Sequence, residues 1–177
     1  MKKKFFSLLL TVLLVAAVMT STASAGGNVG LKSVQFSIGS LIANGTLTGL
    51  GGYKSGVTAD LAARGIPTVL CTNQGGNQAS GQNPSKIFAN GKQYIGPQAI
   101  TKKGTAFMDV EASPGSITAL EGGCPNNNWS AKIVSVAWTN ATISVYDTAT
   151  GALLLERNYI CDPTKQTATT AYCTEIH

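Results

Sequence analysis

The chain of 177 residues carries 13 lysines and arginines against 8 acidic residues, which gives a formal net charge of +5. Nucleic-acid-binding surfaces need clustered basic residues, and beyond the N-terminus only Lys102 and Lys103 are adjacent, so the charge does not indicate nucleic-acid binding. The only histidine is the last residue, His177, a poor position for the oriented imidazole that nucleophilic catalysis or a histidine-ligated zinc site requires.

The first 25 residues have the three parts of a secretory signal peptide. Three consecutive lysines precede an apolar run from Phe5 to Val18, and small residues ending in Ala23-Ser24-Ala25 follow it. The apolar run is shorter than the about 20 residues that a membrane-spanning helix needs. We therefore expect cleavage after Ala25 and a secreted, extracytoplasmic protein. Removal of the three lysines leaves 10 basic residues against 8 acidic ones, a net charge of +2.

Residues 26–177 have the length of a single domain, and no segment among them is apolar enough to span a membrane. Their four cysteines are an even set, which in an exported protein predicts two disulfides. Three pairings are possible. We favour Cys71–Cys124, which joins two asparagine-rich loops, and Cys161–Cys173, which closes a short polar loop near the C-terminus. The spacing lacks the paired C-x-x-C pattern of zinc sites, so we expect neither a metal nor a cofactor.

Alternating apolar and polar residues predict strands along the first half of the mature chain. Asn44-Gly45 suits a two-residue hairpin turn, but the alternation continues in phase across it and favours one strand. Arg64 to Pro67 reads as a turn, and Asn90-Gly91 indicates either a small hairpin or one irregular strand. The predicted strands are 34–38, 41–47, 57–63, 68–72, 86–95 (one strand, or a hairpin of 86–89 and 92–95) and 106–112.

The second half predicts three more strands, at 131–138, 141–146 and 152–160. A turn at Thr139-Asn140 is expected between the first two, and the loop from Asp147 to Gly151 between the last two. No stretch of the mature chain has a helical period. About eight to nine short strands with frequent turns predict an all-β fold, an antiparallel β-sandwich of immunoglobulin-like or similar type.

Two polar loops carry a resemblance to a known group. The pattern Cys71-Thr-Asn-x-Gly-Gly-Asn-Gln-x-x-Gly-Gln-Asn-Pro84, with a later Cys124-Pro-Asn-x-Asn-Trp129, resembles a group of uncharacterised bacterial secreted proteins, over about residues 34–155. The resemblance implies a small exported β-rich domain and the same Cys71–Cys124 pairing. It implies no activity, and the Cys161–Cys173 pair lies outside the shared pattern.

The same two loops supply the candidate binding residues. Amide side chains with an adjacent tryptophan suit hydrogen bonding and stacking to a sugar, and a carbohydrate-binding module is one hypothesis. Tyr53, Tyr94 and Trp138 are further aromatic candidates, although Trp138 stands in an apolar strand and is expected in the core. The candidates in the loops are Asn73, Asn77, Gln78, Asn126, Asn127 and Trp129.

Four acidic residues suggest two other functions, glycoside hydrolysis and calcium binding. Asp109 and Glu111 point to one face of a predicted strand at about 7 Å Cα separation, which a glycoside hydrolase could use, but an alternating strand explains them more simply. Asp147, Asp162 and the asparagine-rich loops offer oxygen ligands for calcium, which usually needs several carboxylates, but the segment from Asp147 to Gly151 has one acid and is interpreted as a turn. We therefore expect an exported structural or interaction domain without catalytic machinery, with a carbohydrate or a cell-surface protein as its partner. The carbohydrate module and the hydrolase are the alternatives.

Overall fold

The computed structural model describes residues 28–37 and 40–177; the predicted signal peptide, its cleavage site and Ile38 of the first predicted strand lie outside them. The described residues form ten strands and two short 3-10 turns, Leu50–Gly52 and Pro97–Ala99. The strands are β1 (Gly30–Ser37), β2 (Leu41–Thr48), β3 (Val57–Thr72), β4 (Gln78–Ser80), β5 (Ile87–Ile95), β6 (Ala106–Pro114), β7 (Ser130–Asp147), β8 (Leu153–Cys161), β9 (Thr170–Ala171) and β10 (Cys173–Ile176).

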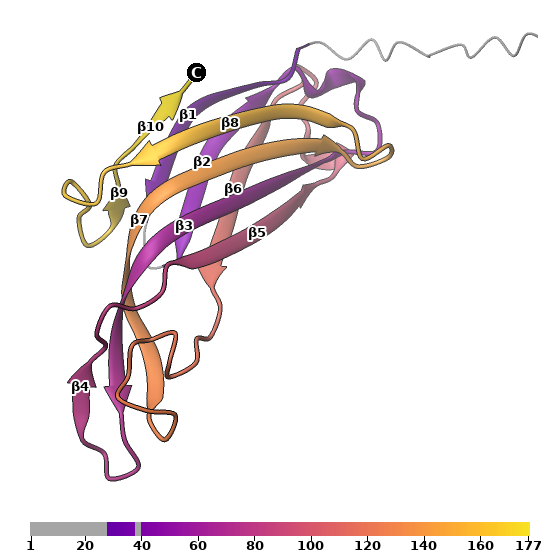
Figure 1. Ribbon diagram of the computed structural model, residues 1–177. Coiled ribbons are helices and arrows are strands. Elements are labelled where there is room, and N and C mark those ends of the chain that lie inside the picture. The colour runs from indigo at the N-terminus through magenta and orange to yellow at the C-terminus, as the bar shows by residue number, and fades with distance from the viewer. Residues whose placement is uncertain (1–27, 38–39) are drawn as a thin grey trace, which may run out of the picture.

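All strand pairs are antiparallel, in the order β10-β8-β7-β3-β5-β6-β2-β1-β9, with β4 added to β3 (Figure 1). The predicted all-β antiparallel class is confirmed, with one strongly curved, sandwich-like sheet folded over its core. The two ends of the sheet, β9 and β10, are separated in the chain by Tyr172 alone. The C-terminal segment therefore reaches from β1 at one end of the sheet to β8 at the other, and this keeps the sheet curved around the core.

The second disulfide fixes this connection. Cys161 of β8 and Cys173 of β10 are direct cross-strand partners and are bonded to each other, as the sequence predicts. A loop of this length stabilises by about 3 kcal/mol in the chain-entropy model. Together with the Cys71–Cys124 bond, it is typical of a protein that folds in an oxidising compartment outside the cytoplasm. In residues 28–37 and 40–177, no helix has the length and apolar character to cross a bilayer.

Alternating side chains on the inner face of the sheet make the core. Each large apolar side chain buried here stabilises by roughly 1.5–3 kcal/mol. Phe36 of β1 packs edge-on against Tyr159 of β8, with ring centroids 5.1 Å apart, so the two ends of the sheet also touch through the core. The largest fully buried side chains are Trp138, Leu41, Leu47, Leu50, Leu61, Met108, Ile143, Val57, Val110 and Val145.

Two strands are longer than the sequence predicts. β3 continues through Arg64–Pro67, where a turn is predicted, and β7 continues through Thr139-Asn140, where a hairpin is predicted. Both predictions are wrong for one reason. The β3–β7 register shifts between Arg64 and Gly65, opposite Thr139, and such a bulge bends a strand pair without ending it.

The residues at this bend explain why the turn signals do not end β3. A side chain at Gly65 would collide with Val136, so glycine allows the two strands to approach closely. Pro67 lacks an N–H, and it lies between the part of β3 that pairs with β5 and the part that pairs with β4. The missing donor is therefore tolerated there.

Other local predictions are confirmed. β2 runs as one strand through Asn44-Gly45. Asn90-Gly91, for which the sequence leaves a hairpin and one strand open, lies within the single strand β5. The β7–β8 hairpin closes as predicted: the N–H of Gly151 donates to the carbonyl of Asp147 at 2.8 Å, and Gly151 has φ +71°. A positive φ at the end of such a loop favours glycine.

Beyond the bend, β3 and β7 leave the main core and form a projecting arm, which consists of Thr68–Thr72, β4, Ser130–Ser135 and the loops 73–86 and 115–129 (Figure 1). The arm has a separate apolar cluster, in which Val69 and the bonded Cys71 and Cys124 are buried. Ile117, Ala119, Trp129 and Ala131 pack against this cluster.

Tyr159 has an unsatisfied buried hydroxyl. The residue is 4% exposed, and its hydroxyl has no hydrogen-bond partner in the described part of the chain. Burial, with a smaller contribution from the negative charge of Glu175, raises the pKa of Tyr159 to about 12. The unfolded chain loses this proton near pH 10, while the folded protein retains it until about pH 12. Stability therefore decreases as the pH rises through this window.

We expect Tyr159→Phe to be as stable as the wild type at pH 7, or more stable by up to about 1 kcal/mol, because it removes a buried donor that has no partner. Its advantage should grow between pH 10 and pH 12. Urea denaturation of both proteins across this range measures the effect, with the exposed Tyr94→Phe as the control. A Tyr159→Phe protein that is clearly less stable at pH 7 would mean that the hydroxyl does have a partner.

Candidate functional site

The predicted disulfide between the two asparagine-rich loops is present. Cys71 at the end of β3 bonds to Cys124 in the loop before β7, with 5.6 Å between their α-carbons. Cys71 is completely buried and Cys124 is nearly so, and both lie in the arm's own cluster. The bond therefore holds the two loops together in a cluster that contacts the main core through Ile117.

The first loop turns back on itself at Asn73. The side-chain oxygen of Asn73 accepts a hydrogen bond from the N–H of Asn77 at 2.9 Å, and its backbone bonds to Asn77 and Gly76. Asn side chains often close turns in this way. Asn73 is thus occupied with shaping the loop, whereas Asn77 and Gln78 are exposed at its tip and available to a partner.

The second loop divides its residues in the same way. The side-chain oxygen of Asn126 accepts from the N–H of Asn128 at 2.9 Å, and its backbone carbonyl accepts from Trp129. Trp129 is half-buried against the disulfide cluster. Asn127 is exposed. Of the three candidates in this loop, only Asn127 has its side chain facing solvent without a structural role.

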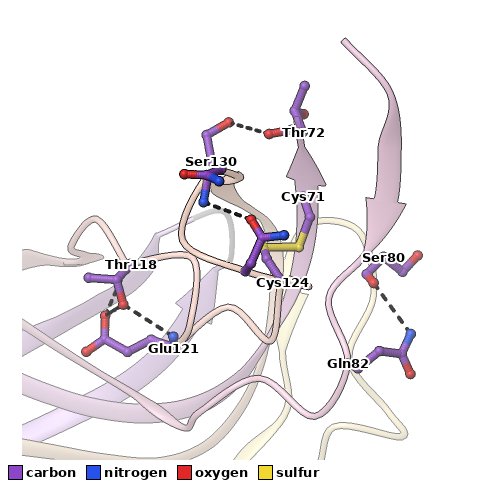
Figure 2. Close-up of a disulfide and its surroundings, with 10 residues drawn as sticks. Cys71, Thr72, Ser80, Gln82, Thr118, Glu121, Cys124 and Ser130 are labelled. Carbon is purple, nitrogen blue, oxygen red and sulfur yellow. Dashed lines mark hydrogen bonds between the residues drawn. A yellow bond between two sulfur atoms is a disulfide. The ribbon is translucent and has the colours of Figure 1, made fainter. Parts of the chain in front are cut away.

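Both loops leave the same end of one strand pair. Thr72, the last residue of β3, is the register partner of Ser130, the first residue of β7. The Ser130 hydroxyl donates to the Thr72 carbonyl at 3.2 Å and closes this end (Figure 2). Asn77, Gln78 and Asn127 therefore extend from a common base. We call the surface that these three side chains form the arm tip. It contains no titratable side chain.

A second contact between the loops is one that the sequence analysis missed. The N–H of Gln82 donates to the carbonyl of Gly123 at 2.8 Å, and Ser85 bonds to Glu121 in the same way. A side chain at Gly81 would collide with the carbonyl of Gly122, so the glycines permit this close backbone approach.

Thr118 and Glu121 hold the second loop at this contact (Figure 2). The Glu121 carboxylate accepts from both the N–H and the hydroxyl of Thr118 at 2.8 Å, and these bonds lower the pKa of Glu121. The Thr-x-x-Glu spacing is the signature of a capping box, a sequence signal that could have indicated this fold of the loop.

The aromatic candidates do not gather at one place. Trp138 is completely buried in the main core, as its apolar strand predicts, and Tyr53 packs against the same core. Trp129 belongs to the arm cluster. Tyr94 is 58% exposed on β5 and donates its hydroxyl to the Ser55 carbonyl. The structure thus brings the candidate amides together but not a stacking platform.

Asp109 and Glu111 are both exposed on the outer face of β6. Asn44 donates to Asp109 at 3.2 Å, and Ser113 donates to Glu111 at 2.9 Å. Hydrogen bonds from Ser40 and then Ser113 lower the pKa of Glu111. A glycoside hydrolase needs one ionised carboxylate and one carboxyl group whose raised pKa keeps it protonated, and the lowered pKa of Glu111 suits only the ionised role.

The two acidic residues considered for calcium hold turns. Asp147 accepts from the N–H of Ala149 and the hydroxyl of Thr150, and Asp162 accepts from Thr164 and pairs with Lys165 at 3.2 Å. The bonds from Thr164, then that pairing, lower the pKa of Asp162. Among the residues that the structure describes, no three His, Cys, Asp or Glu side chains lie together in a metal-binding arrangement.

Comparison of the chain with protein-family models, with curated proteins and with solved structures gives no match.

We expect replacement of Cys71 and Cys124 by alanine to lower the free energy of unfolding by about 4 kcal/mol, because the bond closes a loop of 53 residues. Hydrogen exchange should show the loss of protection concentrated in the arm, since its cluster is separate from the main core. The matched control is replacement of Cys161 and Cys173, which should instead expose β9 and β10. Equal loss of protection throughout the sheet would contradict an independent arm.

Proposed function

We propose that the protein is exported, loses residues 1–25 and acts outside the cytoplasm as an interaction domain that binds a partner through the arm tip. The lysine-rich start, the apolar run and the Ala-x-Ala site support export. The two disulfides support an oxidising destination. The loop motifs suggest membership of a group of bacterial secreted proteins. That membership is consistent with export and with an oxidising destination.

The observation that carries the proposal is the way the arm tip is held. β3 and β7 run past the main core, and a buried disulfide with its own apolar cluster locks the two loops that they lead into. Loops held by a rigid scaffold are where binding residues concentrate. Because Asn77, Gln78 and Asn127 are fixed at their base, little conformational entropy is lost when a partner binds them.

The chemistry of the tip decides the class of partner. Neutral amides offer both donors and acceptors, and the tip carries no charge. Such a surface suits backbone and hydroxyl groups of a cell-surface protein, and binding to it should depend little on salt. The same amides would also suit sugar hydroxyls, so a carbohydrate-binding module is the second candidate. It lacks the support of an exposed aromatic ring, because Trp129 is half-buried.

A role without catalysis is supported by two placements. His177 is exposed. Asp109 and Glu111 are exposed on the outer face of β6 and belong to its solvated side.

Export predicts a defined product. N-terminal sequencing of the protein collected outside the producing cell should begin at Gly26, because cleavage follows Ala25. Replacement of Ala23 and Ala25 by bulky residues should leave the precursor uncut. Recovery of the intact chain with Met1 from the outside would contradict this part of the proposal.

Docking at the arm tip predicts position-dependent cross-linking. A photo-reactive amino acid at Asn127 should cross-link a defined partner in producing cells, whereas the same group at Thr150 should not. Thr150 is an exposed matched control, because it lies in the hairpin at the other end of β7. The Asn127 product should persist at high salt and be lost when Cys71 and Cys124 are replaced by alanine. Equal cross-linking from both positions would contradict docking at the tip.

A further inference from the structure

The outer face of the main sheet has a hollow of about 470 Å³ where β5, β3 and β7 lie side by side. Pockets of this volume are common binding sites for small ligands. We call it the Arg64 hollow. Its side chains come from three strands: Ala62 and Arg64 of β3, Phe88 and Asn90 of β5, and Asn140 and Thr142 of β7.

The strand register explains why the surface is hollowed here. Ala62 is paired with Asn90 on one side and with Thr142 on the other, so a short side chain stands between two longer ones. Arg64 in the next row is paired with Phe88 and Asn140. The bulge beside Arg64 bends the sheet at the same place, and bulges are frequent beside binding sites.

Arg64 gives the hollow its charge. Its guanidinium carbon lies 4.8 Å from the centroid of the Phe88 ring, which is itself 62% exposed. Stacking on a ring orients the planar guanidinium and leaves its N–H groups free to bind a carboxylate at two points. No ion pair of Arg64 occurs in the described residues, and the hollow has no acidic residue in its lining.

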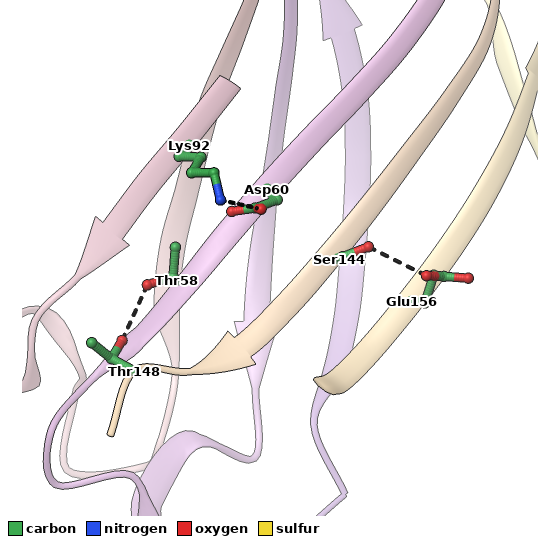
Figure 3. Close-up of polar contacts among 6 residues, drawn as sticks. All are labelled: Thr58, Asp60, Lys92, Ser144, Thr148 and Glu156. Carbon is green, nitrogen blue, oxygen red and sulfur yellow. Dashed lines mark hydrogen bonds and ion pairs between the residues drawn. The ribbon is translucent and has the colours of Figure 1, made fainter. Parts of the chain in front are cut away.

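The adjacent row on the same face has its own internal partners (Figure 3). Lys92 pairs with Asp60 at 2.9 Å, which raises the pKa of Lys92, and Ser144 contacts Glu156. The carboxylate of Asp60, the nearest acid along β3, is thus already paired with Lys92. The charge of Arg64 remains uncompensated.

The amides around the hollow complete its chemistry. Asn90 and Asn140 have no side-chain hydrogen-bond partner among residues 28–37 and 40–177, and both are exposed at the rim. The Thr142 hydroxyl donates to Asn158 at 2.8 Å, which holds a third amide beside them. Free amides with a donor and an acceptor match vicinal sugar hydroxyls. An extended peptide is a poorer fit, because both edges of β3 are already paired here.

We propose that the Arg64 hollow binds a sugar that carries a carboxylate, of the hexuronic acid type. Arg64 binds the carboxylate, Asn90 and Asn140 bind the hydroxyls, and Ala62 leaves room for the ring. Phe88 is a positioning residue that orients the guanidinium. This site lies on the main sheet and does not depend on docking at the arm tip.

The test uses the exported protein with both disulfides formed, and trimers of galacturonic acid and of glucuronic acid as probes. Isothermal titration calorimetry should show binding at least tenfold tighter than to the neutral galactose and glucose trimers. A charge-assisted carboxylate contact is worth about this factor or more. Binding should weaken as salt is added, because the contact is electrostatic and exposed.

Three variants separate the roles. Arg64→Gln should lose at least tenfold in affinity for the uronate trimers, and Arg64→Lys should lose less because it keeps the charge but not the two-point contact. Ala62→Leu should abolish binding by filling the hollow, although it removes no polar group. Circular dichroism and thermal unfolding confirm that each variant folds.

Two controls complete the design. Lys165→Gln removes one positive charge from a second stacked pair, since Lys165 lies 5.3 Å from the Tyr172 ring, and should leave the affinity unchanged. Asn127→Ala at the arm tip should also leave it unchanged. The proposal is overturned if uronate trimers bind no better than neutral ones, if folded Arg64→Gln and Ala62→Leu proteins bind like the wild type, or if a glutamate tripeptide binds as tightly as the uronates.

Discussion

The ladder between β3 and β7 is the interaction on which the rest of the structure depends. All 16 residues of β3 have a partner in β7. One half of this ladder lies across the main core, and the other half carries the arm. The bulge at Arg64 and Gly65 bends the pair between the two halves, so one continuous set of backbone hydrogen bonds joins the core, the Arg64 hollow and the arm tip.

The two disulfides act on different parts of this frame. Cys161–Cys173 joins β8 to β10 where the C-terminal segment spans the two ends of the sheet, so it maintains the curvature around the core. Cys71–Cys124 lies in a small cluster of its own, in which one buried valine and four partly buried apolar residues would stabilise poorly without the bond. The covalent bond therefore supplies stability that the small apolar cluster of the arm cannot provide. Both candidate surfaces consist of side chains held by rigid strands or bonded loops.

Alternation in the sequence predicted most strands and their inward faces because a half-buried strand imposes a period of two. It failed at Arg64–Pro67 and at Thr139-Asn140. Glycine, proline and asparagine there have the composition of turns, and only the facing strand shows that they form a bulge. The loops were correctly brought together by their cysteines. Asn73 and Asn126 could not be separated from Asn77 and Asn127 by sequence, because which amide closes a turn depends on the loop's conformation.

The sequence by itself determined the all-β class, the presence of two disulfides and the polar character of the two loops. These follow from local composition, from period-two burial and from an even number of cysteines. Only the tertiary structure decided that Arg64, Phe88 and Asn140 share one hollow and that Asn77 and Asn127 share one tip. Residues more than 20 positions apart become neighbours through strand register, and register is set by packing across the whole sheet.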